Sequence, residues 1–124
     1  MKTTQAVPIL AALAQETRLS IFRALVQAGP EGLAAGRIAE AVGAPASTLS
    51  FHLKELASAG LARSRQDGRF IYYSADYAAM SELVAFLTEK CCQGMPANQV
   101  ARIGQAVASC CPPAAAPLKR RSAS

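Results

Sequence analysis

Four cysteines stand as two adjacent pairs toward the C-terminus, and their spacing raises the first chemical question. The pairs are Cys91-Cys92, in TEKCCQGMP, and Cys110-Cys111, in SCCPP. Neighbouring cysteines are poor disulfide partners for each other, because their Cα atoms lie about 3.8 Å apart and ordinary bridges need roughly 4.4 Å or more. Two neighbouring thiolates can instead converge on one large soft ion. The pairs therefore predict a site for a thiophilic ion, while a disulfide between one pair and the other stays geometrically open.

Length and composition predict one small domain with a basic surface. The chain has 124 residues, of which 52% are hydrophobic and 17% are charged, so a packed core can form. A chain this short buries a modest share of its surface, and dimerisation would stabilise it. Thirteen Lys and Arg against eight Asp and Glu give a net charge of +5. That sign suits a polyanionic partner such as nucleic acid.

The N-terminus imitates a secretory signal only in part. Lys2 precedes an apolar run from Ala6 to Ala14, but Pro8 interrupts the run and the helical pattern continues beyond it. No apolar run reaches the roughly 18 residues that a membrane span needs. We therefore expect a cytoplasmic protein with no membrane partner, in which thiols stay reduced and clustered cysteines bind metal more often than they form disulfides.

Hydrophobic periodicity predicts a mainly helical N-terminal part. Apolar residues recur at three- and four-residue spacing in four segments. These segments are separated by helix-breaking stretches such as AGPEG. The first helix is expected to begin at Val7, which would place Pro8 in its first turn. Ser47 is the expected N-cap of the fourth, because serine accepts a hydrogen bond from the first helical turn. The expected helices span residues 7–14, 16–28, 34–43 and 47–60.

The segment LARSRQDGRFIYYS changes period and predicts a β-hairpin. Arg63 and Arg65 alternate with Ser64, residues 70–73 are aromatic or β-branched, and Asp67-Gly68 is a strong signal for a two-residue turn. We expect these two residues to form the turn.

The C-terminal third predicts two more helices and a tail. An apolar face predicts a helix to about Lys90, with Asp76 or Ser74 as its cap. A shorter helix is expected over residues 97–109. The low-complexity end, PPAAAPLKRRSAS, predicts a disordered tail.

The order helix, helix, turn, helix, hairpin, helix predicts a winged helix-turn-helix, a mainly α fold with a β-hairpin wing. A helix that enters a DNA groove needs short polar side chains at its leading end, so that its backbone can approach the bases. The fourth helix meets this need. Its expected DNA contacts are Ser47, Thr48, Ser50, His52 and Lys54.

Three arginines surround the expected hairpin turn. Arg63 and Arg65 share one strand face, and Arg69 follows the turn. Such a wing neutralises phosphates or probes a minor groove. Each signal has an ordinary alternative, since arginines on a hairpin can be a solvated face and His52 can be a packing residue. Their arrangement on consecutive elements favours binding to double-stranded DNA.

Three segments, LAALAQETRLSIFRAL, STLSFHLKELASAGL and RQDGRFIYYS, resemble the ArsR/SmtB family of metal-responsive winged-helix repressors. The resemblance covers roughly residues 6–92 and is most specific over 47–73. It implies a homodimer whose first and last long helices form the interface, operator DNA as the partner, and repression that ends when an inducer binds. We expect a DNA-binding and dimerisation domain in residues 1–92 and a cysteine-bearing extension in 93–124.

Within the family, the cysteines resemble one type of sensor. Zinc sensors carry Asp and His ligands along the last long helix, but DYAAMSELVAFLTEK has no histidine. Other members carry cysteines at the start of the helix before the recognition helix, and GLAAGRIAEAVG has none. The pair in FLTEKCC resembles that of arsenite sensors, which bind As(III) or Sb(III) through three sulfurs. This chain departs from the usual version, because residues 93–109 contain no cysteine.

The resemblance implies a three-sulfur site built from Cys91, Cys92 and either Cys110 or Cys111, with the fourth thiol spare or exchanging. The second pair can come from the same subunit or from the partner. As(III) is the expected inducer, Sb(III) and methylated trivalent arsenicals stay open, and no organic cofactor is expected. A thiol-redox sensor and a constitutive DNA-binding protein are the alternatives. We expect no enzymatic activity, because the sequence has no Cys-x-x-Cys motif, Gly-rich phosphate loop or paired carboxylates.

Overall fold

The computed structural model describes residues 1–109, with the side chain of Cys92 outside the description. The chain divides into two compact units between Leu87 and Thr88, five residues before the boundary expected from the sequence. Cys110, Cys111 and the expected tail lie outside the described residues.

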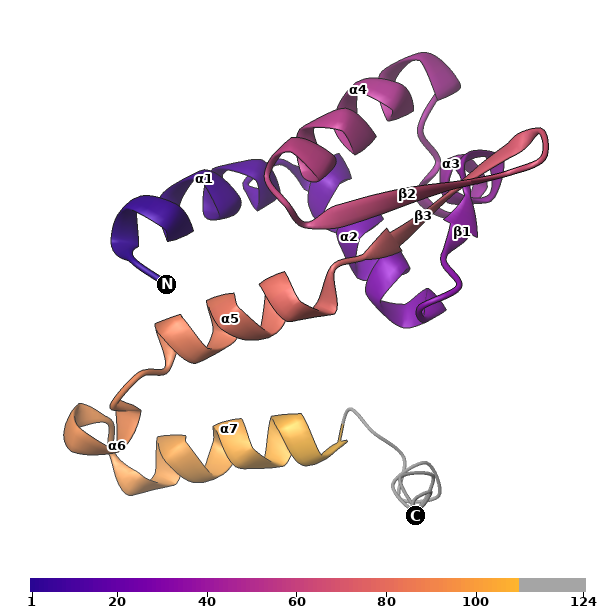
Figure 1. Cartoon of the computed structure of the whole chain (residues 1–124). Helices are drawn as coiled ribbons and strands as arrows, with labels where there is room; N and C mark the ends of the chain where they lie inside the picture. Colours follow the sequence, from indigo (N-terminus) through magenta and orange to yellow (C-terminus); the bar gives the residue numbers. More distant parts are fainter. Residues whose placement is uncertain (110–124) are drawn as a thin grey trace. The chain divides into compact units, whose positions relative to one another are not determined.

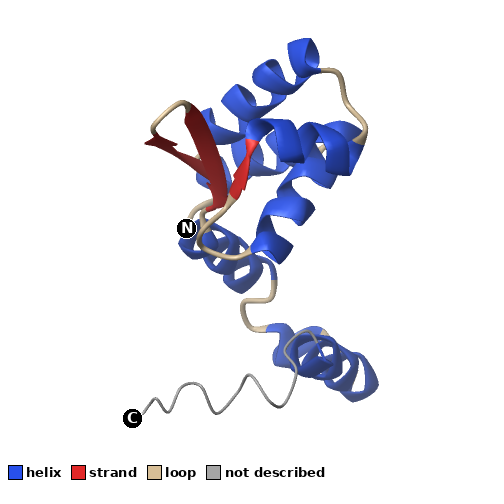
Figure 2. Ribbon diagram, turned by 90° about the vertical axis from the view of Figure 1, so that its right-hand side faces the viewer, coloured by secondary structure: helices blue, strands red, loops and turns tan. Residues whose placement is uncertain are grey.

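The first unit has the expected winged helix-turn-helix fold (Figure 1). Four helices precede the hairpin and one follows it, and a short strand that the sequence did not predict joins the hairpin. Figure 2 shows the strands together on one side of the unit, with helices packed beside them. The elements are α1 (Thr3–Leu13), α2 (Glu16–Ala28), β1 (Leu33–Ala34), α3 (Ala35–Val42), α4 (Ala46–Ser58), β2 (Ala62–Asp67), β3 (Phe70–Ala75) and α5 (Tyr77–Leu87).

The core of this unit forms where α2 and α4 meet the base of the hairpin. Helix α4 buries Leu49, Leu53 and Leu56, which recur every three or four residues and therefore share one face. Full burial of a leucine contributes about 1.5–3 kcal/mol to the free energy of unfolding, so these residues fix the rotation of α4 and leave its opposite face in solvent. The largest fully buried side chains are Ile21, Leu25, Ile38, Leu53, Leu56 and Leu61.

The sheet is antiparallel with strand order β1-β3-β2. Strand β1 pairs Leu33 with Tyr73. Gly32, just before β1, has a φ of 79°, and a Cβ atom there would collide with the backbone of Tyr73. Glycine therefore permits both the left-handed conformation and the close approach of β1 to β3.

The hairpin turn is one residue later than the sequence predicted. Asp67 pairs with Phe70, so the turn residues are Gly68 and Arg69. Gly68 has a φ of 64°, which is the sign required at the first central position of a type II′ turn and favours glycine. Asp67 therefore belongs to β2, and Arg69 occupies the tip of the wing.

Two predictions about helix starts are wrong. Helix α1 begins at Thr3, so Pro8 lies in its interior instead of its first turn. Helix α4 begins at Ala46 with Pro45 as N-cap residue, so Ser47 is not the cap. The Pro45 carbonyl accepts the N–H groups of Thr48 and Leu49, and this starts the helix before Ser47. Pro45 fits because its extended backbone is compatible with proline.

Asp76, one of the two residues predicted to cap α5, is its N-cap. The Asp76 carboxylate accepts the Ala79 N–H at 3.0 Å, which satisfies a backbone donor of the first turn. Ser74, the other candidate, lies within β3. The helix ends at Leu87, three residues before the expected Lys90.

The second unit contains two helices in its described part. α6 (Cys91–Gly94) is a single turn, and α7 (Ala97–Ser109) matches the helix predicted over 97–109. Lys90, before α6, has a φ of 57° and is the one non-glycine residue with positive φ among those described. Across both units, no described helix is long and apolar enough to cross a membrane.

Candidate nucleic-acid interface and cysteine pair

The outward face of α4 is the leading candidate for a DNA-reading surface. Ser47, Phe51, Lys54 and Ser58 are exposed and follow one another at spacings of four, three and four residues, so they form one stripe. The stripe lies opposite the buried leucines of the same helix. Two of its members, Ser47 and Lys54, were predicted as DNA contacts. Phe51 was not, although its side chain is 56% exposed.

Thr48 and Ser50 flank this stripe. The Thr48 hydroxyl donates to the Pro45 carbonyl at 3.1 Å, and the Ser50 hydroxyl donates to the Ala46 carbonyl at 3.5 Å. Both side chains are exposed. Because each hydroxyl proton is directed at the helix's own backbone, the hydroxyl oxygens face outward chiefly as acceptors.

His52 is half-buried and contacts the protein interior more than the other expected DNA residues. Its Nδ1 lies 3.4 Å from an Arg18 guanidinium nitrogen, and Arg18 Nε donates to the Ala12 carbonyl at 2.7 Å. Arg18 therefore joins the C-terminal end of α1 to the middle of α4. An arginine can only donate, so this arrangement suits a His52 tautomer whose Nδ1 accepts and whose Nε2 carries the proton.

The three wing arginines have different surroundings. Arg69, at the turn, is exposed and makes no hydrogen bond or ion pair with the residues that the structure describes. Arg65 donates to the Glu31 carbonyl at 3.0 Å, lies 3.6 Å from Asp67, and stacks over the Tyr72 ring at 4.8 Å. Arg69, at the tip of the wing, therefore has fewer contacts within the protein than Arg65, which lies further from the tip.

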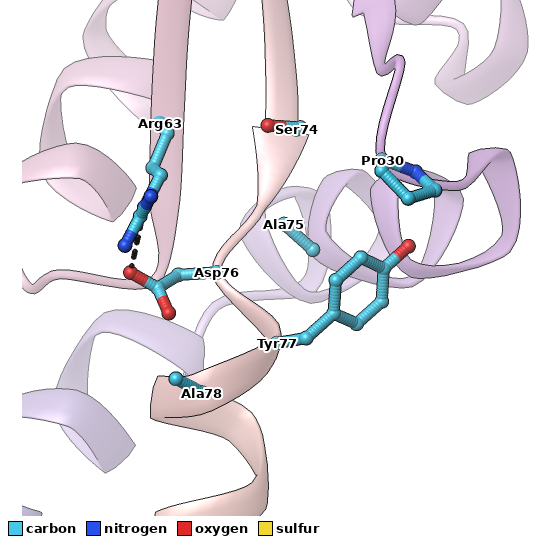
Figure 3. Close-up of a pocket in the computed structure, with 7 residues that line it drawn as sticks. All are labelled: Pro30, Arg63, Ser74, Ala75, Asp76, Tyr77 and Ala78. Atoms are coloured by element: carbon cyan, nitrogen blue, oxygen red, sulfur yellow. Dashed lines mark hydrogen bonds and ion pairs between the residues drawn. The ribbon is translucent and has the colours of Figure 1, made fainter.

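Arg63, at the base of the wing, pairs with Asp76 (Figure 3). Its Nε lies 3.1 Å from the carboxylate, and the two side chains line one open pocket with Tyr77 and Pro30. The Ala79 backbone N–H lowers the pKa of Asp76 most, and Arg63 lowers it further, while burial opposes both. The Asp76 carboxylate partly neutralises the charge of Arg63, so Arg63 should attract a DNA phosphate less strongly than an unpaired arginine would.

The first cysteine pair lies on the single turn α6. Cys91 is half-buried, and Cys92 is placed in the helix by its backbone. Among the side chains that the structure describes, which do not include that of Cys92, no three His, Cys, Asp or Glu lie close enough together to hold a metal ion. The expected partners Cys110 and Cys111 fall outside the described residues, so the three-sulfur site stays a prediction.

Comparison with known proteins agrees with the helix-turn-helix fold. A family model described as a helix-turn-helix domain matches residues 13–65. The nodulation protein NolR of Rhizobium meliloti is 36% identical over 80 residues, which are 64% of this chain and 63% of that protein. The alignment therefore spans slightly less than two thirds of NolR.

Two further relatives are matched over more of their length. A CadC homologue of Staphylococcus aureus, named as a cadmium resistance transcriptional regulatory protein, is 32% identical over 66% of this chain and 68% of that protein. The solution structure of a homodimeric winged helix-turn-helix DNA-binding domain from Mycobacterium bovis, described as a possible ArsR-family transcriptional regulator, is 31% identical. It has a TM-score of 0.56 and covers 73% of this chain and 83% of that one.

The chain belongs to the ArsR/SmtB family. It has the DNA-binding fold of that family, and the relatives from Staphylococcus aureus and Mycobacterium bovis are named as transcriptional regulators. Sequence reasoning had found the fold and the family. It had not predicted that Phe51 lies exposed on the outward face of α4, because a phenylalanine in an amphipathic helix is ordinarily a core residue. The available signal was its spacing of four residues from Ser47, away from the Leu49–Leu53–Leu56 face.

Proposed function

We propose that this chain is a metalloid-responsive repressor, which binds operator DNA as a homodimer and dissociates when As(III) binds its C-terminal thiolates. The observation that carries the proposal is the Cys91-Cys92 pair, which three residues separate from the end of α5 in a chain with the winged helix-turn-helix fold. Vicinal thiolates are suited to a soft trivalent ion. A regulator of this kind would act in the cytoplasm, where its thiols stay reduced.

Dimerisation is supported by apolar side chains that the first unit leaves exposed. Val7 and Leu10 on α1, and Val84 and Leu87 on α5, are each at least 40% exposed. Apolar groups on two long helices of a small domain favour association with a second copy. The related Mycobacterium bovis domain is homodimeric, and the same state here would present two copies of α4 to one operator.

DNA binding is supported by the polar stripe on α4 and the arginines of the wing. In a dimer, two recognition helices would enter the major groove about one helical turn apart, roughly 34 Å. The wing would supply sequence-independent phosphate contacts. Operator recognition then depends on the separation of the two α4 helices, which a change in the dimer helices can alter.

Induction requires arsenic binding to favour a state with low DNA affinity. Cys91 and Cys92 would supply two sulfurs, and Cys110 or Cys111 the third. A coupling free energy of about 1–3 kcal/mol between the arsenic site and the DNA site would lower operator affinity by about 5- to 150-fold. Antimonite and methylated trivalent arsenicals share the required thiophilicity, and the spare thiol is a candidate for discriminating among them.

The test is operator binding by fluorescence anisotropy under fully reducing conditions. The duplex is the DNA immediately upstream of the chain's own gene, and the complex is titrated with arsenite and, separately, with zinc. Release by arsenite alone supports the proposal. Release by an oxidant in a separate titration without reductant, but not by arsenite, would identify a thiol-redox sensor. Tight binding that resists every addition would identify a constitutive DNA-binding protein.

A matched control separates ligation from folding. Cys91→Ser should abolish arsenite release and leave operator affinity unchanged, because serine keeps the size of the side chain but is a poor ligand for a soft ion. Single Ser variants at Cys110 and Cys111 then show which of these supplies the third sulfur. Arsenite release that survives the replacement of both Cys110 and Cys111 by Ser would contradict the proposed ligand set.

A further inference from the structure

Phe51 occupies the centre of the exposed face of α4. The buried residues Leu49, Leu53 and Leu56 define the opposite face, and a helix turns by about 100° per residue. Ser47 and Ser58 lie along the same outward line, four residues before Phe51 and seven after it. The one large apolar side chain on this face is therefore in the position that any partner of α4 meets first.

The exposure of Phe51 is not required by the fold. Its side chain is 56% exposed, and its recorded ring contact is an edge contact with His52 at a centroid distance of 5.6 Å. The other members of the stripe, Ser47, Lys54 and Ser58, are polar or charged. Single exposed apolar residues are common on protein surfaces, so it is the placement of this ring on the DNA-reading face that carries meaning.

The chemistry of a phenyl ring restricts what it can read. It has neither a hydrogen-bond donor nor an acceptor, whereas every base edge in the major groove presents donors or acceptors. The 5-methyl group of thymine is the apolar feature of that groove, and apolar side chains contact it. We propose that Phe51 reads a thymine methyl group in each half of the operator, and this inference rests on the proposed binding of operator DNA.

The position along the helix fits this role. Phe51 lies four residues, about 6 Å along the helix axis, inward from Ser47 at the leading end of α4. The N-terminal residues of a recognition helix are those that contact base edges. Ser47 and Lys54 flank the ring, so they can bind phosphates or polar base edges while Phe51 fixes the location of an A·T pair with thymine on one strand.

The experiment removes the methyl group from the DNA without changing base pairing. Each thymine in the operator is replaced in turn by deoxyuridine, and the affinity of the full-length wild-type chain is compared with that of Phe51→Ala by anisotropy. We expect one thymine in each half-site at which deoxyuridine weakens wild-type binding by about fourfold, the effect of returning one methyl group to water. The same replacement should change the affinity of Phe51→Ala by less than twofold.

Two controls keep the result specific. Ser58→Ala changes a side chain on the same face about 10 Å further along α4, and it should keep the full deoxyuridine effect. Phe51→Leu keeps an apolar side chain and should retain part of it. Phe51→Ala should unfold at the wild-type midpoint, because the ring is exposed and alanine favours the helix.

The outcomes are distinct. Equal deoxyuridine effects in the wild type and in Phe51→Ala, or no effect at any thymine, would overturn the assignment of Phe51 while leaving operator binding intact. Failure of the wild type to prefer its upstream DNA over random duplex would refute both the proposed function and this inference. Arsenite release should be the same in Phe51→Ala as in the wild type.

Discussion

Arg63 Nε lies 3.1 Å from a carboxylate oxygen of Asp76, and the other oxygen of that carboxylate accepts the Ala79 N–H at 3.0 Å. One side chain therefore joins the base of the wing to the first turn of α5. Asp76 precedes Cys91 by fifteen residues, and α5 is the helix that lies between them in the sequence.

Asp76→Ala should lower the free energy of unfolding by about 1 kcal/mol, because alanine cannot cap α5. Asp76→Asn should cost less, since asparagine is also a good cap and only the charge is lost. Urea unfolding at neutral pH measures both. Equal losses in the two variants would show that the charge of Asp76, and not its capping hydrogen bond, dominates.

The same carboxylate predicts a pH dependence. Its folded-state pKa is lowered below the ordinary value of 3.8, so its contribution to stability is present above about pH 4 and is lost as the pH falls through the folded-state pKa. The difference in unfolding free energy between wild type and Asp76→Asn should therefore shrink in that acid range. A difference that stayed constant from pH 6 to pH 2 would contradict the lowered pKa.

Arg69→Ala should reduce binding to operator and random DNA alike. Arg69 has no competing ion pair among the described residues, so its loss removes a phosphate contact and should lower the slope of log affinity against log salt by about 1 per subunit. Arg63→Ala is the matched comparison, and its salt slope should change less because Asp76 already neutralises that charge. Equal slopes for the two variants would refute this ranking.

Arg18→Ala should destabilise the first unit by about 1–3 kcal/mol, the range for hydrogen bonds to charged groups and for partners left unsatisfied. Arg18 holds the Ala12 carbonyl and faces His52. Arg23→Ala, on the exposed side of the same helix, should change stability by no more than about 0.5 kcal/mol. Thermal or urea unfolding of both variants distinguishes an interhelix contact from a general effect of removing positive charge.

Gly32→Ala should destabilise the fold by about 2 kcal/mol or more. A side chain at a φ of 79° is strained, and the added Cβ would collide with the Tyr73 backbone that pairs with β1. Gly36→Ala is the control, because its Cβ would meet nothing within 4 Å and alanine favours α3. If both variants unfolded at the wild-type midpoint, the close approach of β1 and β3 would be wrong.

Arsenite affinity should fall as the pH is lowered, because thiols must lose protons to ligate. Isothermal titration in buffers of different ionisation enthalpy should detect proton release on binding, and Cys91→Ser should release fewer protons. An arsenite affinity that did not vary with pH would count against thiolate ligation.

The fold could be predicted from sequence where the signal is local. Periodic leucines predicted α4, and the Asp67-Gly68 turn signal before the aromatic and β-branched residues 70–73 predicted the hairpin. Strand β1 was missed because two residues carry no pattern, and the strand forms only by pairing with β3, about 40 residues later. The cap at Ser47 was wrong because Pro45 supplies the carbonyl that starts the helix.

The residue types of the candidate site could be predicted from the sequence, but their contacts with the rest of the protein could not. The polar leading end of α4 and the arginines around the turn were visible in the sequence, but the difference between Arg63 and Arg69 depends on Asp76, which comes from the next helix. The contact between Arg18 and His52 spans 34 residues, so no local pattern could reveal it. The exposure of Phe51 depends on which face of α4 its buried leucines occupy.

Strand β2 lies at the edge of the sheet, and five of its six residues are exposed. An open edge presents unpaired backbone groups to which the strand of another molecule can add, and charged side chains on such an edge discourage that addition. The charged side chains of β2 therefore oppose aggregation in addition to making the wing basic. They are Arg63, Arg65 and Asp67. A variant that lacks several of these charges should be checked for self-association by light scattering before weak DNA binding is attributed to lost phosphate contacts.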